Sequence, residues 1–259
     1  MTITATTLDA LLANELGRYL WPFFRIAGVV MVAPIFGARL VPMRIKLALS
    51  VAIALAVSPM LPASPAMVAG PAAGLVVVHE IVLGIAMGFC LQMIFDAVVI
   101  AGQTIAMSMG LGFAMMVDPQ RGVSVPVLSQ FFLILGMLVF LSLGGHLAMI
   151  RMLVDSFELL PVGESLTGEG IWTLLAWGSE MFAGALRVAI PAVTALLVVN
   201  LAFGVMSRAA PTLNLFAIGF PTALLLGFVV LLFNIGSFPA TFSQLLQSAF
   251  ENIVALLSI

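Results

Sequence analysis

Six apolar stretches alternate with short polar ones along the chain. A membrane-spanning helix needs about 20 mostly apolar residues. The stretches cover residues 20–36, 45–61, 73–100, 127–150, 181–206 and 213–236. A short amphipathic tail, 239–259, follows the last one. The pattern predicts an all-α membrane protein with about six hydrophobic segments, forming a single domain over residues 1–259.

The segment between the third and fourth stretches breaks this pattern. It reads GLGFAMMVDPQRGVSVPVLSQ and covers residues 110–130. Pro119 and Pro126 each lack a backbone donor, and each disfavours helical angles in the residue before it. Irregular backbone at membrane depth is tolerated only where protein buries it or where it lines a cavity. We therefore expect a cavity-lining segment here, and it is the first candidate for function.

Composition supports a polytopic membrane protein. The chain is 63% hydrophobic and 8% charged, whereas soluble domains average about 25% charged residues. A net charge of -2 provides no basic field for nucleic acid. With basic residues taken to mark the cytoplasmic side, six spans would place both termini on the other side.

Enzyme motifs are missing from the sequence. It contains no HExxH zinc site, no GxSxG elbow and no P-loop. Gly110, Leu111 and Gly112 are similar to part of an intramembrane aspartyl protease signature, but Phe113 stands where the catalytic Asp would be. We predict a protein that is not an enzyme and that has no cofactor.

Polar and small residues share one face of the third stretch. Gly84, Gly88, Gln92 and Asp96 step by four, and Gln103 lies seven beyond Asp96. A GxxxG pair permits close helix approach, and polar side chains hydrogen-bond across such a contact. An assembly seam is the favoured interpretation, and an ion or proton path through Asp96 is the alternative.

Arg25 lies inside the first apolar stretch. Leaving it unpaired at the bilayer centre costs about 2.5 to 3.5 kcal/mol on insertion scales. It therefore needs a partner, such as Asp96 or an acid of a neighbouring chain, or it lies close enough to the interface to snorkel. For His79, Glu80 and His146 we expect interface or packing roles in preference to metal binding.

Four motifs resemble the FliR/SctT family of type III export-apparatus membrane proteins. They read RIAGVVMVAPIFGARLVPMRIKLALS at 25–50, GQTIAMSMGLGFAMMVDPQRGVSVPVLSQFF at 102–132, GGHLAMIRMLVDSFELLPVG at 144–163 and SRAAPTLNLFAIGFP at 207–221. The resemblance covers nearly the whole chain in register. Its VDPQ and PVLSQF elements are more similar to the flagellar than to the virulence members.

The resemblance implies a subunit of the flagellar protein export gate in the bacterial inner membrane and flagellar basal body. FliP-like and FliQ-like subunits would form the pore with it, an FlhB-like protein would contact it, and unfolded flagellar substrates would pass through. Subunits of that family form helical hairpins in a right-handed spiral, held partly above the membrane plane. The spans that insert need not be those of the assembled state.

The resemblance also implies a pore plug at residues 107–122. Glycines give its backbone freedom, methionines and a Phe give adaptable apolar bulk, and Asp-Pro gives a turn. The flexible thioethers suit a seal, although Met in an apolar segment also serves ordinary packing. The predicted plug residues are Met107, Met109, Gly110, Gly112, Phe113, Met115, Met116, Asp118, Pro119 and Gly122.

Arg208, Pro211 and Asn214 form a predicted tight turn that fixes the last hairpin against neighbouring subunits. The alternative is an ordinary loop, because Pro starts helices well and Asn caps them.

A small-solute secondary transporter is the rival function. Asp96 would be its coupling site, and the Pro-broken segments would be its discontinuous helices. Such transporters are built from inverted repeats, and the two halves of this sequence show none.

Overall fold

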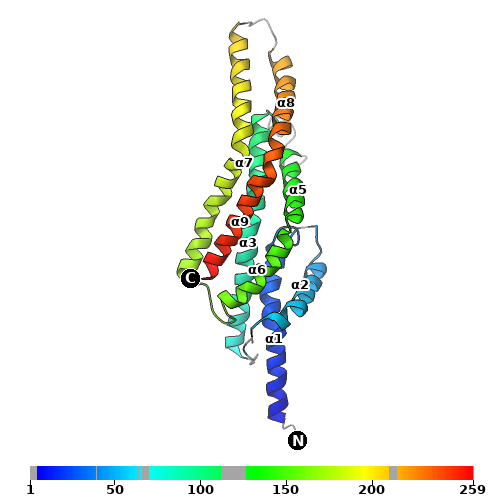
Figure 1. Cartoon of the computed structure of the whole chain (residues 1–259), viewed down its shortest axis with the longest axis vertical. Coiled ribbons are helices and arrows are strands. Elements are labelled where there is room, and N and C mark those ends of the chain that lie inside the picture. Colours follow the sequence, from blue (N-terminus) through cyan, green and yellow to red (C-terminus); the bar gives the residue numbers. More distant parts are fainter. Residues whose placement is uncertain are drawn as a thin grey trace. The chain divides into compact units, whose positions relative to one another are not determined.

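The structure is a computed structural model that describes residues 5–38, 40–62, 65, 70–111, 127–209 and 215–258 (Figure 1). Two single-turn helices, η1 and η3, cover Ser58–Met60 and Ile235–Ser237. The α-helices are α1 Ala5–Val32, α2 Met43–Val57, α3 Pro71–Ser108, α5 Val127–Ser142, α6 Gly145–Leu159, α7 Gly168–Ala209, α8 Leu215–Asn234 and α9 Phe238–Leu257. No strand occurs in these residues, which confirms the predicted all-α class.

Fewer helices qualify as membrane spans than the six predicted. Within the described residues, four qualify by length and composition, over Met43–Met60, Pro71–Ser108, Gly168–Ala209 and Pro221–Leu257. The pair α5 and α6, bent by 66°, adds a fifth if both helices belong to one span. The predicted first span falls in α1, which does not qualify. The reason is that α1 ends at Val32 and the 18 residues up to that point contain three charged ones, Glu15, Arg18 and Arg25.

Two helices are longer than a bilayer is thick. At 1.5 Å per residue, the 38 residues of α3 extend about 57 Å and the 42 residues of α7 about 63 Å. The hydrocarbon core measures about 30 Å. About half of each helix therefore has to lie outside the hydrocarbon or be covered by protein.

Contacts divide the chain into two compact units. The first comprises Met1–Met93, Gly144–Gly178 and Leu246–Ile259, and the second comprises Ile94–Leu143 and Ser179–Leu245. Helices α3, α7 and α9 each contribute to both units. A single functional domain over residues 1–259 stays a prediction.

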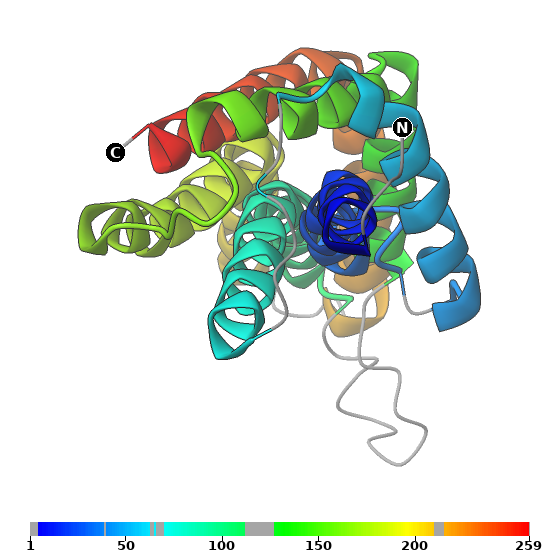
Figure 2. The same cartoon turned by 90° about the horizontal axis from the view of Figure 1, so that it is seen from below.

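The first unit is built around α1. Helix α2 lies beside it, and the first half of α3 crosses it (Figure 2). The start of α7 and the end of α9 also reach α3. Trp177 donates its Nε1–H to the carbonyl of Cys90 at 3.2 Å, and Asn252 donates to the Cys90 sulfur at 3.6 Å. These two bonds attach the later helices to the middle of α3.

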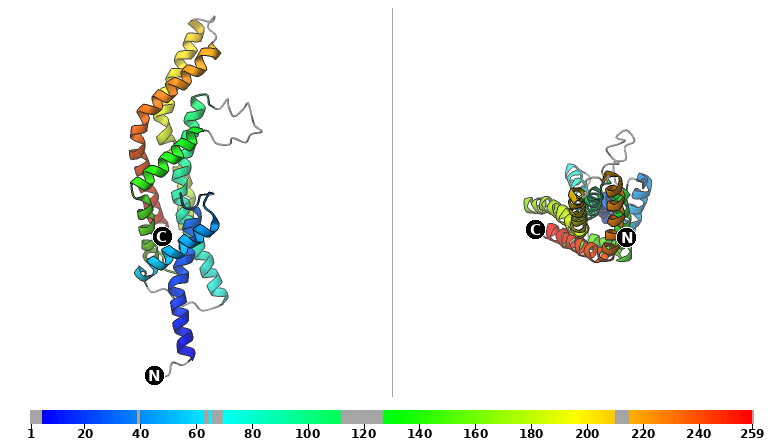
Figure 3. Two further views of the ribbon diagram at one scale, coloured as in Figure 1. Left: turned by 90° about the vertical axis from the view of Figure 1, so that its right-hand side faces the viewer. Right: turned by 90° about the horizontal axis from the view of Figure 1, so that it is seen from above.

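The second unit has an aromatic core. Phe95 of α3 packs edge-on against Phe140 of α5 and Phe242 of α9, with ring centroids 5.6 and 5.5 Å apart. Phe238 stacks on Phe242 at 5.7 Å and meets Phe132 at 5.6 Å. Such pairs add about 0.5 to 1.5 kcal/mol each beyond the area that they bury. In the same unit α7 and α8 run side by side as a hairpin (Figure 3).

Candidate functional site

The glycines of α3 pack directly against the backbone of α1. A Cβ added to Gly84 would lie 2.1 Å from the carbonyl oxygen of Arg25, and one added to Gly88 would lie 3.0 Å from that of Val29. On the opposite side, a Cβ on Gly28 would lie 2.5 Å from the carbonyl oxygen of Ile81. Gly84 and Gly88 thus make the close helix approach that a GxxxG pair permits, with a helix of the same chain. A role of the two glycines in assembly stays a prediction.

The remaining residues of the predicted seam have other surroundings. Gln92 and Asp96 are half-buried, and Gln103 is exposed. The next close backbone contact of α3 is at Gly102, where an added Cβ would lie 2.7 Å from the Cα of Ser129 on α5. A shared assembly role for Gln92, Asp96 and Gln103 stays a prediction.

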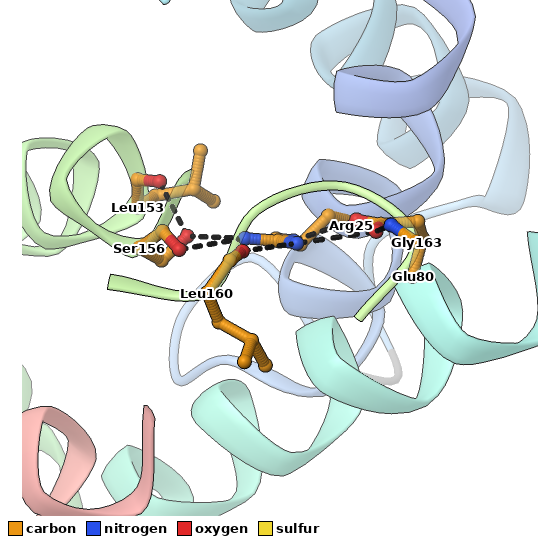
Figure 4. Close-up of polar contacts among 6 residues, drawn as sticks. All are labelled: Arg25, Glu80, Leu153, Ser156, Leu160 and Gly163. Atoms are coloured by element: carbon orange, nitrogen blue, oxygen red, sulfur yellow. Dashed lines mark hydrogen bonds and ion pairs between the residues drawn. The ribbon is translucent and has the colours of Figure 1, made fainter. Parts of the chain in front are cut away.

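Arg25 is fully buried beside these glycines and binds Glu80 of α3 (Figure 4). Its Nε donates to Oε2 of Glu80 at 2.7 Å, and its Nη2 donates to Oε1 at 3.1 Å. Glu80 is also fully buried. Two parallel bonds of this kind are the strongest form of an Arg–carboxylate pair. Arg25 therefore has the acidic partner that was expected, but this partner is Glu80 of the same chain and not Asp96 or an acid of a neighbouring chain. The alternative that Arg25 snorkels to the interface is wrong, because the side chain is fully buried.

The rest of the Arg25 guanidinium caps the end of α6. Its Nη1 donates to the carbonyl oxygen and to Oγ of Ser156, at 2.8 and 3.2 Å, and its Nη2 donates to the carbonyl oxygen of Leu160 at 3.0 Å. The Ser156 carbonyl oxygen also accepts the backbone N–H of Leu160 at 3.0 Å. Carbonyls at the end of a helix carry partial negative charge, so a cation there is favourable. All five N–H groups of the guanidinium therefore have acceptors.

Two further contacts complete the surroundings of the ion pair. The ring of Phe157 lies 4.1 Å from Cζ of Arg25, within cation–π range. The backbone N–H of Gly163, which has a left-handed φ of 96°, points to Oε1 of Glu80 at 3.4 Å. The network thus joins α1, α3, the end of α6 and the turn that follows it.

This arrangement is suited to holding helices together. Both charges are paired and the hydrogen-bonding groups of the guanidinium are occupied, which a buried ion pair needs to offset its desolvation. Within the described residues no group of three or more His, Cys, Asp and Glu side chains could hold a metal ion. The geometry favours a structural joint between three elements.

Sequence reasoning missed Glu80 and the α6 carbonyls as partners of Arg25. Glu80 lies at the start of a long apolar stretch. An acid in such a position is a candidate partner for Arg25, because a buried Arg needs a buried acid. The carbonyls of Ser156 and Leu160 gave no such signal, since every residue has a carbonyl. They do lie in the 144–163 motif.

The predicted plug begins on the end of α3. Met107 is in the last turn and exposed, whereas Met109 is buried. A Schellman motif ends the helix: Gly110, with φ 82°, donates to the carbonyl of Met107, and Leu111 donates to that of Ala106, both at 3.0 Å. The remaining predicted plug residues, Gly112, Phe113, Met115, Met116, Asp118, Pro119 and Gly122, lie outside the described residues.

Met109 is held by α8 within the second unit. A Cβ added to Gly227 would lie 2.6 Å from Cε of Met109, so this glycine accommodates the thioether. On the neighbouring helix, Asn200 donates to the carbonyl of Ser108 at 3.4 Å. The start of the predicted plug is therefore fixed to the α7–α8 hairpin. Of the predicted turn, Arg208 is exposed in the last turn of α7, and Pro211 and Asn214 lie outside the described residues.

These features define a polytopic, all-helical membrane protein whose helices are joined by glycine contacts and a buried ion pair. The family of bacterial export proteins, family 1, matches residues 16–249, and the chain belongs to it. The chain is 40% identical over 241 residues to the flagellar biosynthetic protein FliR of Escherichia coli K12, covering 93% of this chain and 92% of that protein. It is 34% identical over 248 residues to FliR of Pectobacterium carotovorum (95% of each) and 33% identical over 231 residues to FliR of Aquifex aeolicus (88% and 89%).

Proposed function

We propose that this chain is a non-enzymatic subunit of the flagellar type III protein export gate. In this proposal it lies in the bacterial inner membrane at the flagellar basal body. It forms the pore with FliP-like and FliQ-like subunits, an FlhB-like protein contacts it, and unfolded flagellar proteins pass through. Family membership over residues 16–249 carries the proposal, together with relatives named flagellar biosynthetic proteins that the chain matches over 92 and 95% of their length.

The exposed surface supports a role as a subunit. Large apolar side chains on α7 and α8, including Leu197, Leu201, Leu225 and Phe233, are 60 to 81% exposed. Exposed apolar surface on this scale marks contact with lipid or with another protein. A subunit of a membrane complex needs both kinds of contact.

Complementation tests the export role. The chain is expressed in Escherichia coli lacking its own FliR, and secreted flagellin and swimming are measured. Restored secretion is the expected result. A chain that is stable in the membrane but restores no secretion contradicts the proposal. Native mass spectrometry after co-expression with FliP-like and FliQ-like proteins tests the partners, and a stable homo-oligomer without them would count against the gate.

Closure of the pore by residues 107–122 is the second part of the proposal. The glycines, Phe113 and the methionines of that segment support it. Because Met107 and Met109 complete the end of α3, the variant that tests closure removes residues 112–122 alone and keeps the helix cap. We expect an increased ion conductance of the assembled gate in planar bilayers. An unchanged conductance in a complex of normal composition would contradict closure.

The solute-transporter alternative makes the opposite prediction for the isolated chain. Uptake of a labelled solute into liposomes containing this chain alone, lost in Asp96→Asn, would favour the transporter. The gate proposal expects no uptake.

A further inference from the structure

Two breaks in the helices of the second unit lie beside the same small void. Pro191 interrupts α7, and the single turn Ile235–Ser237 separates α8 from α9. Residues of both breaks line the void, whose volume is about 40 Å³. One water molecule needs about 10 to 15 Å³ by this measure, and protein interiors hold few voids larger than one water. The packing is therefore loose at the level where both helices are broken.

Regular helical hydrogen bonding is interrupted at both breaks. Pro191 has no N–H, so the carbonyl of Arg187 lacks the donor that a regular helix would provide. Pro239, which follows the other break, also has no N–H, and the carbonyl of Ile235 accepts from Phe238 instead. Gly236 lies inside this break, and a Cβ added to it would meet nothing within 4 Å. Proline and glycine are the usual causes of helix kinks, so the chain can bend at both places with few contacts to lose.

The part of the second unit on one side of the breaks is firmly packed. A Cβ added to Gly184 of α7 would lie 3.0 Å from the Leu245 side chain of α9 and 3.5 Å from Cβ of Ala97 on α3. The first turns of α9 supply Phe238 and Phe242 to the aromatic core. This part forms a fixed base. We use the name base for residues 94–105, 127–142, 179–190 and 238–245.

Beyond the breaks, α7 and α8 form a hairpin with few buried side chains. We call it the outer hairpin, and it comprises residues 192–209 and 215–234. No residue of α7 from Leu197 to Ala209 is buried, and among residues 221–234 of α8 Gly227 alone is buried. A region with few buried apolar contacts opens and moves at low cost in free energy.

The outer hairpin is nevertheless attached to the end of α3. Met109 lies on the buried Gly227 of α8, where an added Cβ would be 2.6 Å from Cε of the methionine. Asn200 of α7 donates to the carbonyl of Ser108 at 3.4 Å. Both helices of the hairpin therefore contact α3 at the same place, just where α3 ends.

The last turns of α3 have a feature that makes a helix easier to bend. The hydroxyl of Thr104 donates to the carbonyl of Ile100, and that of Ser108 donates to the carbonyl of Thr104, both at 2.9 Å. Side-chain bonds of this kind, to a carbonyl four residues earlier, slightly destabilise a helix and often bend it. The end of α3 can therefore follow a movement of the hairpin.

From this arrangement we propose that the outer hairpin pivots on the base at Pro191 and Ile235–Ser237, and that it carries the end of α3 with it through Met109. Hinges are formed by a few residues at the ends or breaks of elements, and the void provides space for the bend. A protein that binds the exposed face of the hairpin thereby shifts the end of α3, where the predicted plug begins. The pivot is a property of this chain and depends neither on the export role nor on closure of the pore.

Distances between spin labels distinguish a pivot from a rigid kink. Double electron–electron resonance records the distribution of distances in the full chain in detergent, with Cys90→Ala as background because Cys90 is the only cysteine of the sequence. One label is on the base at Leu138→Cys and the other on the outer hairpin at Leu201→Cys, positions that are 60 and 69% exposed. The reference pair, Leu138→Cys with Leu186→Cys, lies entirely on the base. A pivot gives a broader distribution for the first pair than for the reference pair, whereas a rigid kink gives two equally narrow distributions.

Two substitutions that favour a continuous helix test where the bend occurs. Pro191→Ala restores the missing N–H donor, and Gly236→Ala reduces the backbone freedom of the other break. We expect the two together to narrow the distribution of the first pair to the width of the reference pair. Pro221→Ala and Gly204→Ala make the same chemical changes inside the outer hairpin, since Pro221 is inside α8 and Gly204 also meets nothing within 4 Å. These matched controls should leave the distribution broad.

A third pair of labels tests the attachment to α3. Met107→Cys, 57% exposed in the last turn of α3, is combined with Leu201→Cys. Because the end of α3 moves with the hairpin, this pair should give a narrow distribution. Met109→Ala removes the side chain that lies on Gly227, so it should broaden the distribution.

Three outcomes would overturn the proposal. The first is a distribution between base and hairpin as narrow as that of the reference pair in the unsubstituted chain, which identifies a rigid kink. The second is equal narrowing by the hinge substitutions and by their matched controls, which places the flexibility elsewhere. The third is a broad distribution between Met107→Cys and Leu201→Cys in the unsubstituted chain, which shows that the end of α3 does not follow the hairpin.

Discussion

Arg25 and Glu80 are both fully buried. Each charge stabilises the fold only while the other is present to pair with it. Replacing Glu80 with Gln leaves the Arg25 charge buried with amide and carbonyl acceptors alone. Breaking one side of a buried pair costs about 3 to 5 kcal/mol. We expect Glu80→Gln to lower the thermal unfolding midpoint of the detergent-solubilised chain strongly. The matched control is Glu158→Gln, which changes an exposed acid of α6 and should leave the midpoint nearly unchanged.

A double substitution distinguishes the cost of an unpaired buried charge from the loss of the hydrogen bonds that Arg25 makes to α6. Arg25→Met with Glu80→Met removes both buried charges, so it should recover part of the loss seen in Glu80→Gln. Recovery should be incomplete, because the Leu160 carbonyl loses the Arg25 donor and the Ser156 carbonyl keeps only the backbone N–H of Leu160. A double variant less stable than Glu80→Gln would show that the ion pair is not the main source of the effect.

Gly84 allows a second prediction at this scale. Gly84→Ala places a methyl 2.1 Å from a backbone oxygen of α1, and backbone cannot move aside as a flexible side chain can. We expect destabilisation of at least about 1 to 3 kcal/mol, the usual range for overpacking. Gly74→Ala on the same helix meets nothing within 4 Å and should stabilise by up to about 1 kcal/mol through helix propensity. Opposite shifts of the unfolding midpoint would confirm both expectations, and equal shifts would contradict the tight crossing.

Residue patterns in the sequence predicted part of this site. The spacing of Gly84 and Gly88 was sufficient to predict a close helix approach, because glycines four residues apart share a helix face. Spacing along one helix does not identify the residue on a neighbouring helix, so the candidate partners for Arg25 were Asp96 and an acid of a neighbouring chain, and Glu80 was not among them. Glu80 is 55 positions from Arg25 in the chain, and Ser156 is 131. Long-range pairs of this kind depend on the packing of the whole unit.

At the scale of elements, the apolar stretches of the sequence predict where the long helices lie. They do not predict how many of these helices span the membrane. The predicted third and fifth stretches lie in α3 and α7, and the sixth contains α8. The tail expected from residue 239 is α9, which begins at Phe238. The first stretch does not qualify as a span because α1 carries three charged residues close together, and one of them, Arg25, is paired inside the protein. Average hydropathy cannot distinguish a helix that faces lipid from one that faces protein.

The two parts of α7 should respond differently to a charge. Leu201 is 69% exposed in the uncharged stretch, and Trp172 is 70% exposed near the start of the helix beside Glu169. A Lys at the bilayer centre costs about 2.5 to 3.5 kcal/mol. We expect Leu201→Lys to reduce the amount of chain that resists carbonate extraction from membranes severalfold. Trp172→Lys should leave that amount unchanged, and equal losses would mean that the apolar zone of α7 extends to its start.

The cap of α3 is a further test at this scale, because it determines where the helix stops and the predicted plug begins. Gly110 has a left-handed φ of 82°, which costs other L-residues about 1 to 2 kcal/mol. We expect Gly110→Val to lower the unfolding midpoint, while Gly110→Asn lowers it less because Asn tolerates this conformation. Equal effects of the two substitutions would contradict the observed cap.

For the whole molecule, the question is whether the bent pair α5 and α6 crosses the membrane. The answer determines whether the two termini lie on the same side. Helix α5 has 16 residues and extends about 24 Å, which is short of a 30 Å core. Helix α6 carries Arg151, Asp155 and Glu158, all exposed, so it is costly to place in hydrocarbon. We therefore expect the bent pair to enter without crossing, which leaves four spans.

An even number of crossings puts both ends of the chain on the same side of the membrane. Paired fusions of alkaline phosphatase and green fluorescent protein at residues 1 and 259 report the side of each end, because phosphatase is active only outside the cytoplasm and the fluorescent protein only inside it. We expect the same reporter to be active at both ends. A third fusion in the 160–167 connection between α6 and α7 locates the bent pair. If the two ends fall on opposite sides, α5 and α6 together form a fifth span, and the charges of α6 must then be covered by neighbouring subunits, since lipid cannot pair them.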